Sequence, residues 1–233
     1  MGPTVTVKRL RFMNAPVTGC QCHYQATTIE QTANILTHGV WIIPAIYALL
    51  KMLTLSTTQN QYWIAWWYGM ALILLFSTST SFHISSLIFG NNSMISRFLH
   101  FWDRSTIFTF IASCFMPWFV LTETLSNTYV MKWLVCIWLM AMLGITFTYL
   151  FLDRYKLLET LLYVILGVVP SIPILYANQN SGAWELTAGG GIYVMGILFF
   201  KCDGRIPFAH AIWHTFVACG ALIHYSAVIR YKY

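Results

Sequence analysis

Two histidines one helical turn apart, His210 and His214, lie near the start of a stretch that is otherwise apolar enough to cross a membrane. A charged or strongly polar side chain at bilayer depth costs about 2.5 kcal/mol or more unless something compensates it. Residues spaced i and i+4 share one face of a helix, so the two imidazoles are expected to stand side by side. A shared metal ion would compensate both rings, and the pair is therefore a candidate metal site.

Three further reactive side chains are expected in the same leaflet. Ser79 and His83, again spaced i and i+4, lie toward the end of one apolar run, and Asp103 lies near the beginning of the next. Consecutive membrane helices run in opposite directions, so the end of one helix adjoins the beginning of the next. The same topology places the start of the last helix, with His210 and His214, on this side.

These residue types match a catalytic zinc site. Three imidazoles, those of His83, His210 and His214, with a fourth position for water form such a ligand set, with Zn–N distances of about 2.0–2.1 Å. Zn²⁺ lowers the pKa of its bound water to about 7, which supplies hydroxide at neutral pH. Asp103 would act as general base, and Ser79 would orient a ligand or donate to a developing oxyanion. The pattern predicts hydrolysis of an amide or ester.

Each of these residues also has a structural interpretation. A lone histidine in a helix is usually a packing residue, and for His83 taken alone that interpretation is the stronger one. Asp103 could pair with Arg104 or Arg97 at the membrane boundary. The convergence of five reactive side chains in one leaflet favours the catalytic interpretation.

Other polar residues have equally good structural explanations. Glu30, Asn34 and His38 share one face of the first predicted helix, where a packing or capping network accounts for them as well as catalysis does. His100 and His224 are assigned to interface or packing roles.

The elements that must position these residues are membrane helices. Of the 233 residues, 58% are hydrophobic and 9% are charged, whereas a soluble domain carries about a quarter charged residues. A helix needs about 20 apolar residues to cross a bilayer. Runs of this kind recur at 33–53, 62–89, 101–121, 131–152, 157–177, 186–201 and 207–229. We predict an all-α fold, a seven-transmembrane helix bundle over residues 30–233, preceded by a cytosolic N-terminal segment over residues 1–29.

Four prolines fall inside these predicted spans, and neighbouring helices or waters can satisfy the backbone groups that a proline frees. They are expected to kink their helices without breaking them: Pro44, Pro117, Pro170 and Pro173.

The orientation follows from the basic residues, which are retained on the cytosolic side of membrane proteins. With the N-terminus inside, nine Lys and Arg side chains fall on the cytosolic side and four on the other. The N-terminus is therefore predicted to be cytosolic and the C-terminus lumenal or extracellular, which is opposite to a G-protein-coupled receptor. The sequon Asn91-Asn92-Ser93 would then be cytosolic, and a glycan on it would overturn this orientation.

The cysteines predict no disulfide framework. Three fall within predicted helices, and three fall on the predicted cytosolic side, where thiols stay reduced. Acylation of these last three stays open: Cys20, Cys22 and Cys202.

Four motifs resemble the progestin and adipoQ receptor family, which includes the bacterial hemolysin III proteins. They are the run Glu30-x-x-x-Asn34-x-x-Thr37-His38-Gly39, the segment STSFH from Ser79 to His83, Asp103, and FFKCDGRIPFAHAIWH from Phe199 to His214. The last motif, together with H-Y-x-A-x-x-x-Y-x-Y from His224 to Tyr233, resembles the monocyte to macrophage differentiation factor branch. The resemblance covers nearly the whole chain.

The resemblance implies a seven-helix bundle with a cytosolic N-terminus and a zinc ion held near the cytosolic face by His83, His210 and His214, with Asp103 beside them. It also implies hydrolysis of a ceramide-like amide, although the branch itself is associated with signalling and with Golgi and endosomal membranes. The chain departs from its branch at Gln31-Thr32, in place of His-Ala, and at Ser81, in place of an apolar residue. Neither change falls on a proposed ligand.

Three hypotheses follow from these residues together with what the resemblance implies. The first is an integral membrane signalling receptor with an intramembrane Zn²⁺ that hydrolyses a ceramide-like lipid. The second is a non-enzymatic signalling or scaffold protein with a structural zinc. An ion or proton transporter ranks last, because the ionisable residues cluster in one leaflet and line no path through both. The expected partners are a membrane lipid and cytosolic signalling proteins, without nucleic acid, at a Golgi, endosomal or lysosomal membrane.

Overall fold

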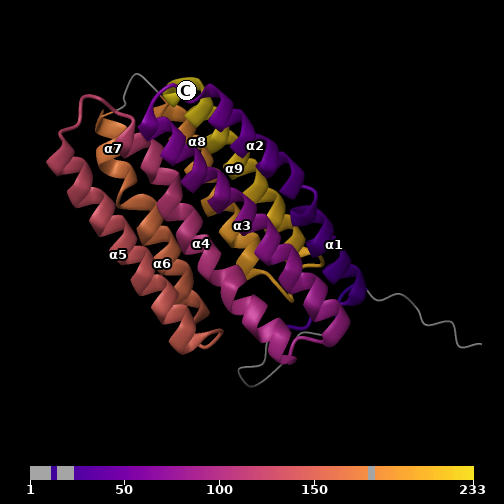
Figure 1. The fold of residues 1–233 in the computed structure, drawn as a ribbon. Helices are drawn as coiled ribbons and strands as arrows, with labels where there is room; N and C mark the ends of the chain where they lie inside the picture. Colours follow the sequence, from indigo (N-terminus) through magenta and orange to yellow (C-terminus); the bar gives the residue numbers. More distant parts are fainter. Residues whose placement is uncertain (1–11, 15–23, 178–181) are drawn as a thin grey trace, which may run out of the picture.

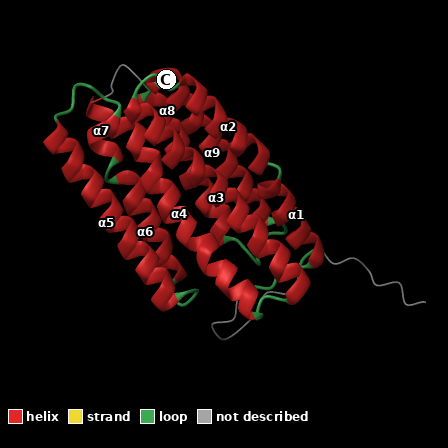
Figure 2. Cartoon of the chain, in the orientation of Figure 1, coloured by secondary structure: helices red, strands yellow, loops and turns green. Residues whose placement is uncertain are grey.

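The computed structural model describes residues 12–14, 24–177 and 182–233. Over these residues the secondary structure is helical, with no strand (Figure 2). The candidate acylation sites Cys20 and Cys22 lie outside the described residues. The helices are α1 (Thr28–Gly39), α2 (Ile42–Leu55), α3 (Gln59–Phe89), α4 (Met94–Val120), α5 (Asn127–Phe151), α6 (Lys156–Val168), α7 (Ser171–Ala177), α8 (Ala183–Lys201) and α9 (Ala209–Lys232).

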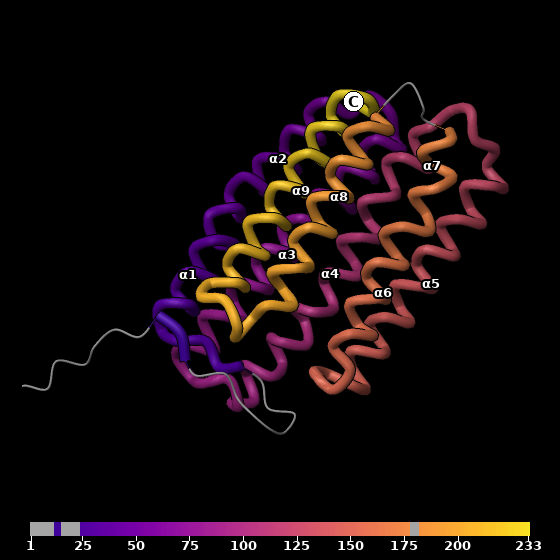
Figure 3. Tube along the Cα trace, turned by 180° about the vertical axis from the view of Figure 1, so that it is seen from behind, coloured from indigo at the N-terminus to yellow at the C-terminus, as the bar shows by residue number. Residues whose placement is uncertain are grey.

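These helices make seven passes through one elongated bundle. Helices α1 and α2 follow each other along one pass, as do α6 and α7 (Figures 1 and 3). Six of the passes are long and apolar enough to cross a membrane, and the seventh is α4, with 27 residues. The predicted all-α seven-helix bundle is confirmed.

The more polar α4 is the central helix of the bundle. It packs against α3, α5, α6, α7 and α9. Its polar side chains therefore face protein and cavities instead of lipid, which a membrane helix tolerates. It begins at Met94, well before the predicted start near residue 101, so Asp103 lies inside the helix and not at its head.

Two of the four prolines in the spans coincide with interruptions of the helix. The ring of a proline clashes with the carbonyl of residue i−4. For Pro44 that residue is Val40, where α1 gives way to α2, and Pro170 lies between α6 and α7. The expectation of kinks without breaks was therefore wrong at these two positions. At Pro117 the helix is not broken, because this residue lies within the continuous α4.

The outside of the bundle is apolar, as expected of a surface in contact with lipid. Large hydrophobic side chains such as Met94 (88% exposed), Ile43 (76%) and Tyr176 (74%) lie on it. Exposed apolar surface on this scale marks a membrane or partner contact in a folded protein. The interior is filled by aromatic side chains, of which Trp118, Tyr68 and Phe108 are fully buried.

One end of the bundle collects the beginning of α1 and the loops α3–α4, α5–α6 and α8–α9, whereas the C-terminus lies at the opposite end (Figures 1 and 3). We call the first of these the α1 end. The sequence predicts that this end faces the cytosol.

Close packing of α4 on α5 depends on Gly144. A Cβ added at this position would overlap the ring of Phe108, which is fully buried and has no room to move. Overpacking of this kind typically costs about 1–3 kcal/mol. We expect Gly144→Ala to lower the thermal unfolding midpoint of the purified protein in detergent. The matched control is Gly167→Ala in α6, where a Cβ would meet nothing within 4 Å; equal midpoints for the two variants would contradict this packing.

Candidate metal centre

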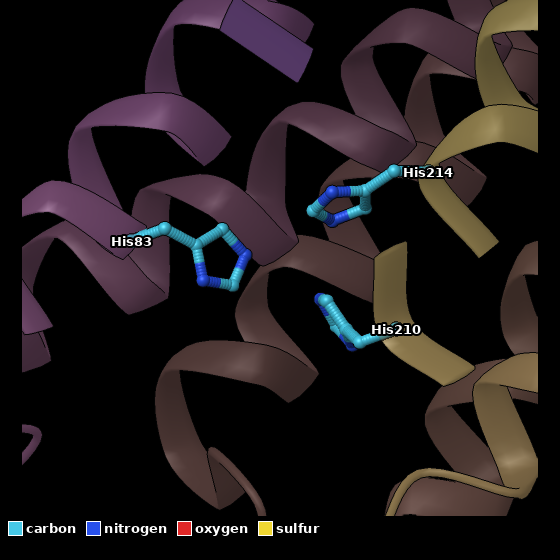
Figure 4. A group of neighbouring side chains, drawn as sticks. All are labelled: His83, His210 and His214. Atoms are coloured by element: carbon cyan, nitrogen blue, oxygen red, sulfur yellow. The ribbon is translucent and has the colours of Figure 1, made fainter. Parts of the chain in front are cut away.

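Three histidines from two helices meet near the α1 end of the bundle. His83 extends from α3, and His210 and His214 extend from α9 one turn apart. Each offers a ligand nitrogen within 4.8 Å of the others. The ring centroids of His83 lie 5.2 Å from those of both His210 and His214, and the latter two lie 4.6 Å apart. Figure 4 shows the rings turned toward a common space.

Helix α1 fixes the orientation of His83. Its Nδ1 lies 2.8 Å from Oε1 of Gln31. A carbonyl oxygen only accepts hydrogen bonds, so Nδ1 carries the proton and Nε2 keeps its lone pair. That Nε2 is buried and has no hydrogen-bond partner among the described residues. A buried acceptor without a partner is costly, which makes this atom a natural metal ligand.

Helix α1 orients His214 in the same way. Its Nδ1 lies 3.1 Å from Oγ1 of Thr37. The Thr37 hydroxyl already donates to the carbonyl of Ala33 at 2.8 Å, so it accepts from Nδ1–H. Nε2 of His214 is thus also left to face the common space. Partners of this type on the far nitrogen are typical of metal-binding histidines.

His210 is held from the α8–α9 loop. Its Nδ1 lies 3.6 Å from Oδ2 of Asp203 and has no hydrogen-bond partner among the described residues. Burial raises the pKa of Asp203 above its ordinary value. With 18% of its side chain exposed, His210 is more open than His83 and His214, which are 3% and 2% exposed.

Glu30 joins the beginning of α1 to the beginning of α9. Its carboxylate accepts hydrogen bonds from the Tyr24 hydroxyl at 2.6 Å, from the Thr27 amide at 2.9 Å and from the Phe208 amide at 3.4 Å. Burial and the bond to Glu30 raise the pKa of Tyr24 to about 12, so its phenol stays a donor. Phe208 is the N-cap of α9, and this contact therefore helps to place His210. The capping interpretation of Glu30 is confirmed.

The α8–α9 loop needs a glycine at this junction. Gly204 has φ +75°, and a Cβ there would lie 2.7 Å from the ring of Tyr24. Only glycine adopts this conformation without strain and leaves room for the aromatic ring.

Ser79 and Asp103 lie beside the histidines in the wall of one cavity, which His38, His210 and His214 also line. Ser79 is buried, and its hydroxyl has no hydrogen-bond partner among the described residues. The structure thus brings together all five residues that the sequence singled out. Their chemical roles stay predictions.

Asp103 does not pair with its neighbour in the chain. Arg104 instead contacts Glu159 at 3.3 Å and Asp153 at 3.9 Å. Glu159 is in turn held by the hydroxyls of Thr148, at 3.0 Å, and Tyr163, at 3.2 Å. The interpretation of Asp103 as an ion-pair partner of Arg104 is therefore not supported.

The histidine group lies between two cavities of different character. A cavity of about 470 Å³, which we call the apolar cavity, extends into the bundle between α3, α4, α6, α7, α8 and α9, with His38 of α1 at its wall. A cavity of about 750 Å³, which we call the polar cavity, lies at the α1 end and is lined by charged and amide side chains. His210, Arg104 and Phe200 line both.

Sequence reasoning missed several residues of this site. Gln31 departs from the family branch, and the structure shows that it bonds a proposed ligand directly. His38 stacks on His214 with a centroid distance of 3.7 Å and an interplanar angle of 16°. A detectable signal existed, because Glu30, Gln31, Asn34 and His38 form one buried polar face on an otherwise apolar helix.

His100 and His224 are held in side-chain contacts of their own, outside the three-histidine group. His224 is bonded to Tyr68 at 2.9 Å and to Trp118 at 3.1 Å. His100 stacks on Phe82 and lies 3.3 Å from Asp153. Both arrangements agree with the packing roles expected from the sequence.

The donor set fits a metal ion. Tetrahedral binding of zinc at about 2.0–2.1 Å separates the ligand nitrogens by about 3.3 Å, so small side-chain rotations suffice from the observed separations of up to 4.8 Å. Three neutral imidazoles without a carboxylate ligand favour zinc, copper, iron or nickel over calcium or magnesium.

Comparisons with known proteins find relatives that match along most of the chain. A family model described as "Haemolysin-III related" matches residues 26–225. The human monocyte to macrophage differentiation factor is 41% identical over 225 residues, which cover 96% of this chain and 92% of that protein. The hemolysin-3 homolog of Bacillus subtilis (strain 168) is 30% identical over 211 residues, covering 88% of this chain and 95% of that protein. Hemolysin-3 of Bacillus cereus is 31% identical over 208 residues, covering 87% and 91%.

The geometry predicts how metal affinity responds to substitution. We expect purified protein to bind one Co²⁺, used as a visible-absorbing probe, and His214→Ala to lose it. Gln31→Leu should weaken binding by about 10- to 100-fold, because it removes the partner that orients His83. The control is Thr32→Ala, since Thr32 is exposed and its hydroxyl bonds only the carbonyl of Thr28. Unchanged affinity in Gln31→Leu, measured by chelator competition, would contradict this role.

Proposed function

We propose that this chain, which belongs to the haemolysin-III-related family of multi-pass membrane proteins, is a signalling receptor of the progestin and adipoQ receptor type. In this proposal its three histidines hold a zinc ion, and the site hydrolyses a ceramide-like lipid amide. One observation carries the proposal. The buried ligand nitrogens of His83, His210 and His214 converge where an apolar cavity meets a polar one. This is the place at which the head of an amphipathic molecule would stop when its chains enter the bundle.

The apolar cavity suits the chains of a lipid. Its volume of about 470 Å³ lies within the range of ligand pockets, about 300–1,000 Å³. Its wall includes Gly167 of α6 with Gly190 and Gly191 of α8, and a Cβ at any of these would meet nothing within 4 Å. Helices α6 and α8 make little contact with each other. We infer that an acyl chain enters from the membrane between them.

The polar side chains around the histidines supply the remaining chemistry. When bound, a zinc ion would act as a Lewis acid and make water acidic enough to ionise near neutral pH. We assign to Asp103, which lines the apolar cavity, the acceptance of a proton from the attacking water and its return to the leaving amine. We assign to the buried hydroxyl of Ser79, which lines the same cavity, donation to the oxygen on which negative charge develops. The apolar walls exclude competing water and strengthen both interactions.

A second function is favoured by the way α1 is bonded to two proposed ligands. Gln31 and Thr37 of α1 hold His83 of α3 and His214 of α9. A metal at this point would cross-link α3 and α9 beside α1, and its binding energy would add to folding stability. A signalling or scaffold protein with a structural zinc, which contacts cytosolic signalling proteins from a Golgi, endosomal or lysosomal membrane, is the alternative proposal.

Turnover separates the two proposals. We expect purified zinc-loaded protein to release sphingosine and fatty acid from a ceramide, and His214→Ala to abolish release. Asp103→Asn should retain zinc and lower the rate by about 10²- to 10⁴-fold, the usual effect of losing a general base. Glu123→Gln, an exposed carboxylate in the α4–α5 loop, serves as the control. If wild type never turns over lipid while His214→Ala loses both zinc and thermal stability, the structural alternative is correct.

A further inference from the structure

The polar cavity at the α1 end is rich in basic side chains. Five basic residues line it: Arg97, Arg104, Lys156, Lys201 and Arg205. Three acidic residues share the same wall: Glu30, Asp153 and Asp203. The cavity thus carries an excess of two positive charges, before any histidine is counted.

The acidic side chains are already engaged elsewhere in the site. Glu30 accepts the hydrogen bonds of the α1–α9 junction, including those of Tyr24 and Phe208. Asp153 contacts His100 at 3.3 Å and Arg104 at 3.9 Å.

The basic side chains, in contrast, have few acidic partners. Among the described residues, Arg97, Lys156 and Arg205 form no ion pair within 4 Å, and Lys201 donates to the backbone carbonyl of Lys156 at 3.0 Å. Arg104 is the one basic group of the cavity with an acidic contact, to Asp153 and Glu159.

Membrane topology alone does not explain this arrangement. Basic residues at cytosolic helix ends are retained by the positive-inside rule, and that rule accounts for exposed side chains such as Arg97. It does not require a guanidinium in the interior, yet Arg104 is only 7% exposed. Arg104 lines both cavities together with His210 and Phe200. Basic side chains therefore line the polar cavity from its mouth to the histidine group, although Arg104, the innermost, is paired with Glu159 and Asp153.

We propose that the lipid bound at this site carries a phosphate headgroup, which occupies the polar cavity while the chains occupy the apolar one. The inference rests on the proposed function for the acyl chains and the amide of the lipid, but not for its phosphate. Lysine ammonium and arginine guanidinium groups are the usual protein partners of phosphate oxygens. A neutral ceramide headgroup would leave Lys156, Lys201 and Arg205 without an ion-pair partner within 4 Å among the described residues.

A matched lipid pair tests the proposal. C16 ceramide and C16 ceramide 1-phosphate differ only in the phosphate. Binding of each to the full-length, zinc-loaded protein in neutral detergent is measured by competition with a fluorescent ceramide, without reference to turnover. We expect the phosphorylated lipid to bind at least tenfold more tightly. The advantage should shrink as salt is raised, because the charges that attract the headgroup lie partly exposed.

Charge variants identify where the preference arises. The double variant Lys156→Gln and Arg205→Gln should lower the preference for phosphate to about twofold or less, with metal content retained as a check on folding. Lys51→Gln with Lys132→Gln removes two exposed charges near the opposite end and should leave the preference intact. A preference below twofold in wild type, or one that survives the first double variant, would overturn the proposal.

Three further outcomes distinguish failure of the headgroup inference from failure of the proposed function. Inorganic phosphate that competes as strongly as ceramide 1-phosphate would show that the cavity binds the free anion, and would overturn the lipid headgroup. Amide turnover with equal binding of both lipids would remove the headgroup inference and leave the proposed function standing. A preference for the phosphorylated lipid without turnover in any assay would support the headgroup inference and overturn the proposed function.

Discussion

The structure depends on the burial of three imidazoles at one point inside a membrane bundle. Two of these rings are almost entirely removed from solvent, and each needs a partner on both nitrogens. The protein supplies one partner per ring from α1, through Gln31 and Thr37. The remaining nitrogens face one another. A shared cation best satisfies the lone pairs of three neutral imidazoles that point toward one space.

This constraint explains why α1 is built as it is. The helix buries one polar face, made of Glu30, Gln31, Asn34 and His38, against α3 and α9. Its remaining surface includes exposed apolar side chains such as Leu36 (59% exposed) and Val40 (59%). A membrane helix that carries polar residues on its buried face is stabilised most when those residues form hydrogen bonds with neighbouring helices. The Glu30 junction then ties the same helix to the start of α9, so that both ends of the histidine group are positioned by α1.

Much of this site could be predicted from residue spacing. The i and i+4 pairs Ser79/His83 and His210/His214 fix which side chains share a helix face, and the alternating direction of the spans fixes which helix ends adjoin. Apolar runs located all seven passes, because the bilayer demands a minimum length of apolar chain. The beginning of α4 was predicted too late, since Ser96, Arg97 and Arg104 lower the hydropathy of a helix whose polar groups face protein.

Other features depend on contacts between distant segments and have no local signature. The pairing of Arg104 with Glu159, separated by 55 residues, could not be chosen over pairing with Asp103 from the sequence alone. The hydrogen bond between Gln31 and His83 likewise spans 52 residues. In the sequence, the departure from the family branch at Gln31 therefore lies far from the proposed ligands. The helices are interrupted near Pro44 and Pro170 but continuous at Pro117, a difference that the presence of proline alone does not predict. The two cavities arise from the arrangement of several helices that are distant in the sequence, and no local sequence pattern predicts them.

The most direct test of this account is X-ray absorption at the zinc K-edge of the purified full-length protein. The account predicts a four-coordinate zinc with nitrogen or oxygen ligands at about 2.0–2.1 Å and multiple scattering from three imidazoles. In His83→Ala the same spectrum should show two imidazoles or no bound zinc. A sulfur shell at about 2.3 Å, or a spectrum of wild type that His83→Ala leaves unchanged, would contradict a zinc ion bound by His83, His210 and His214.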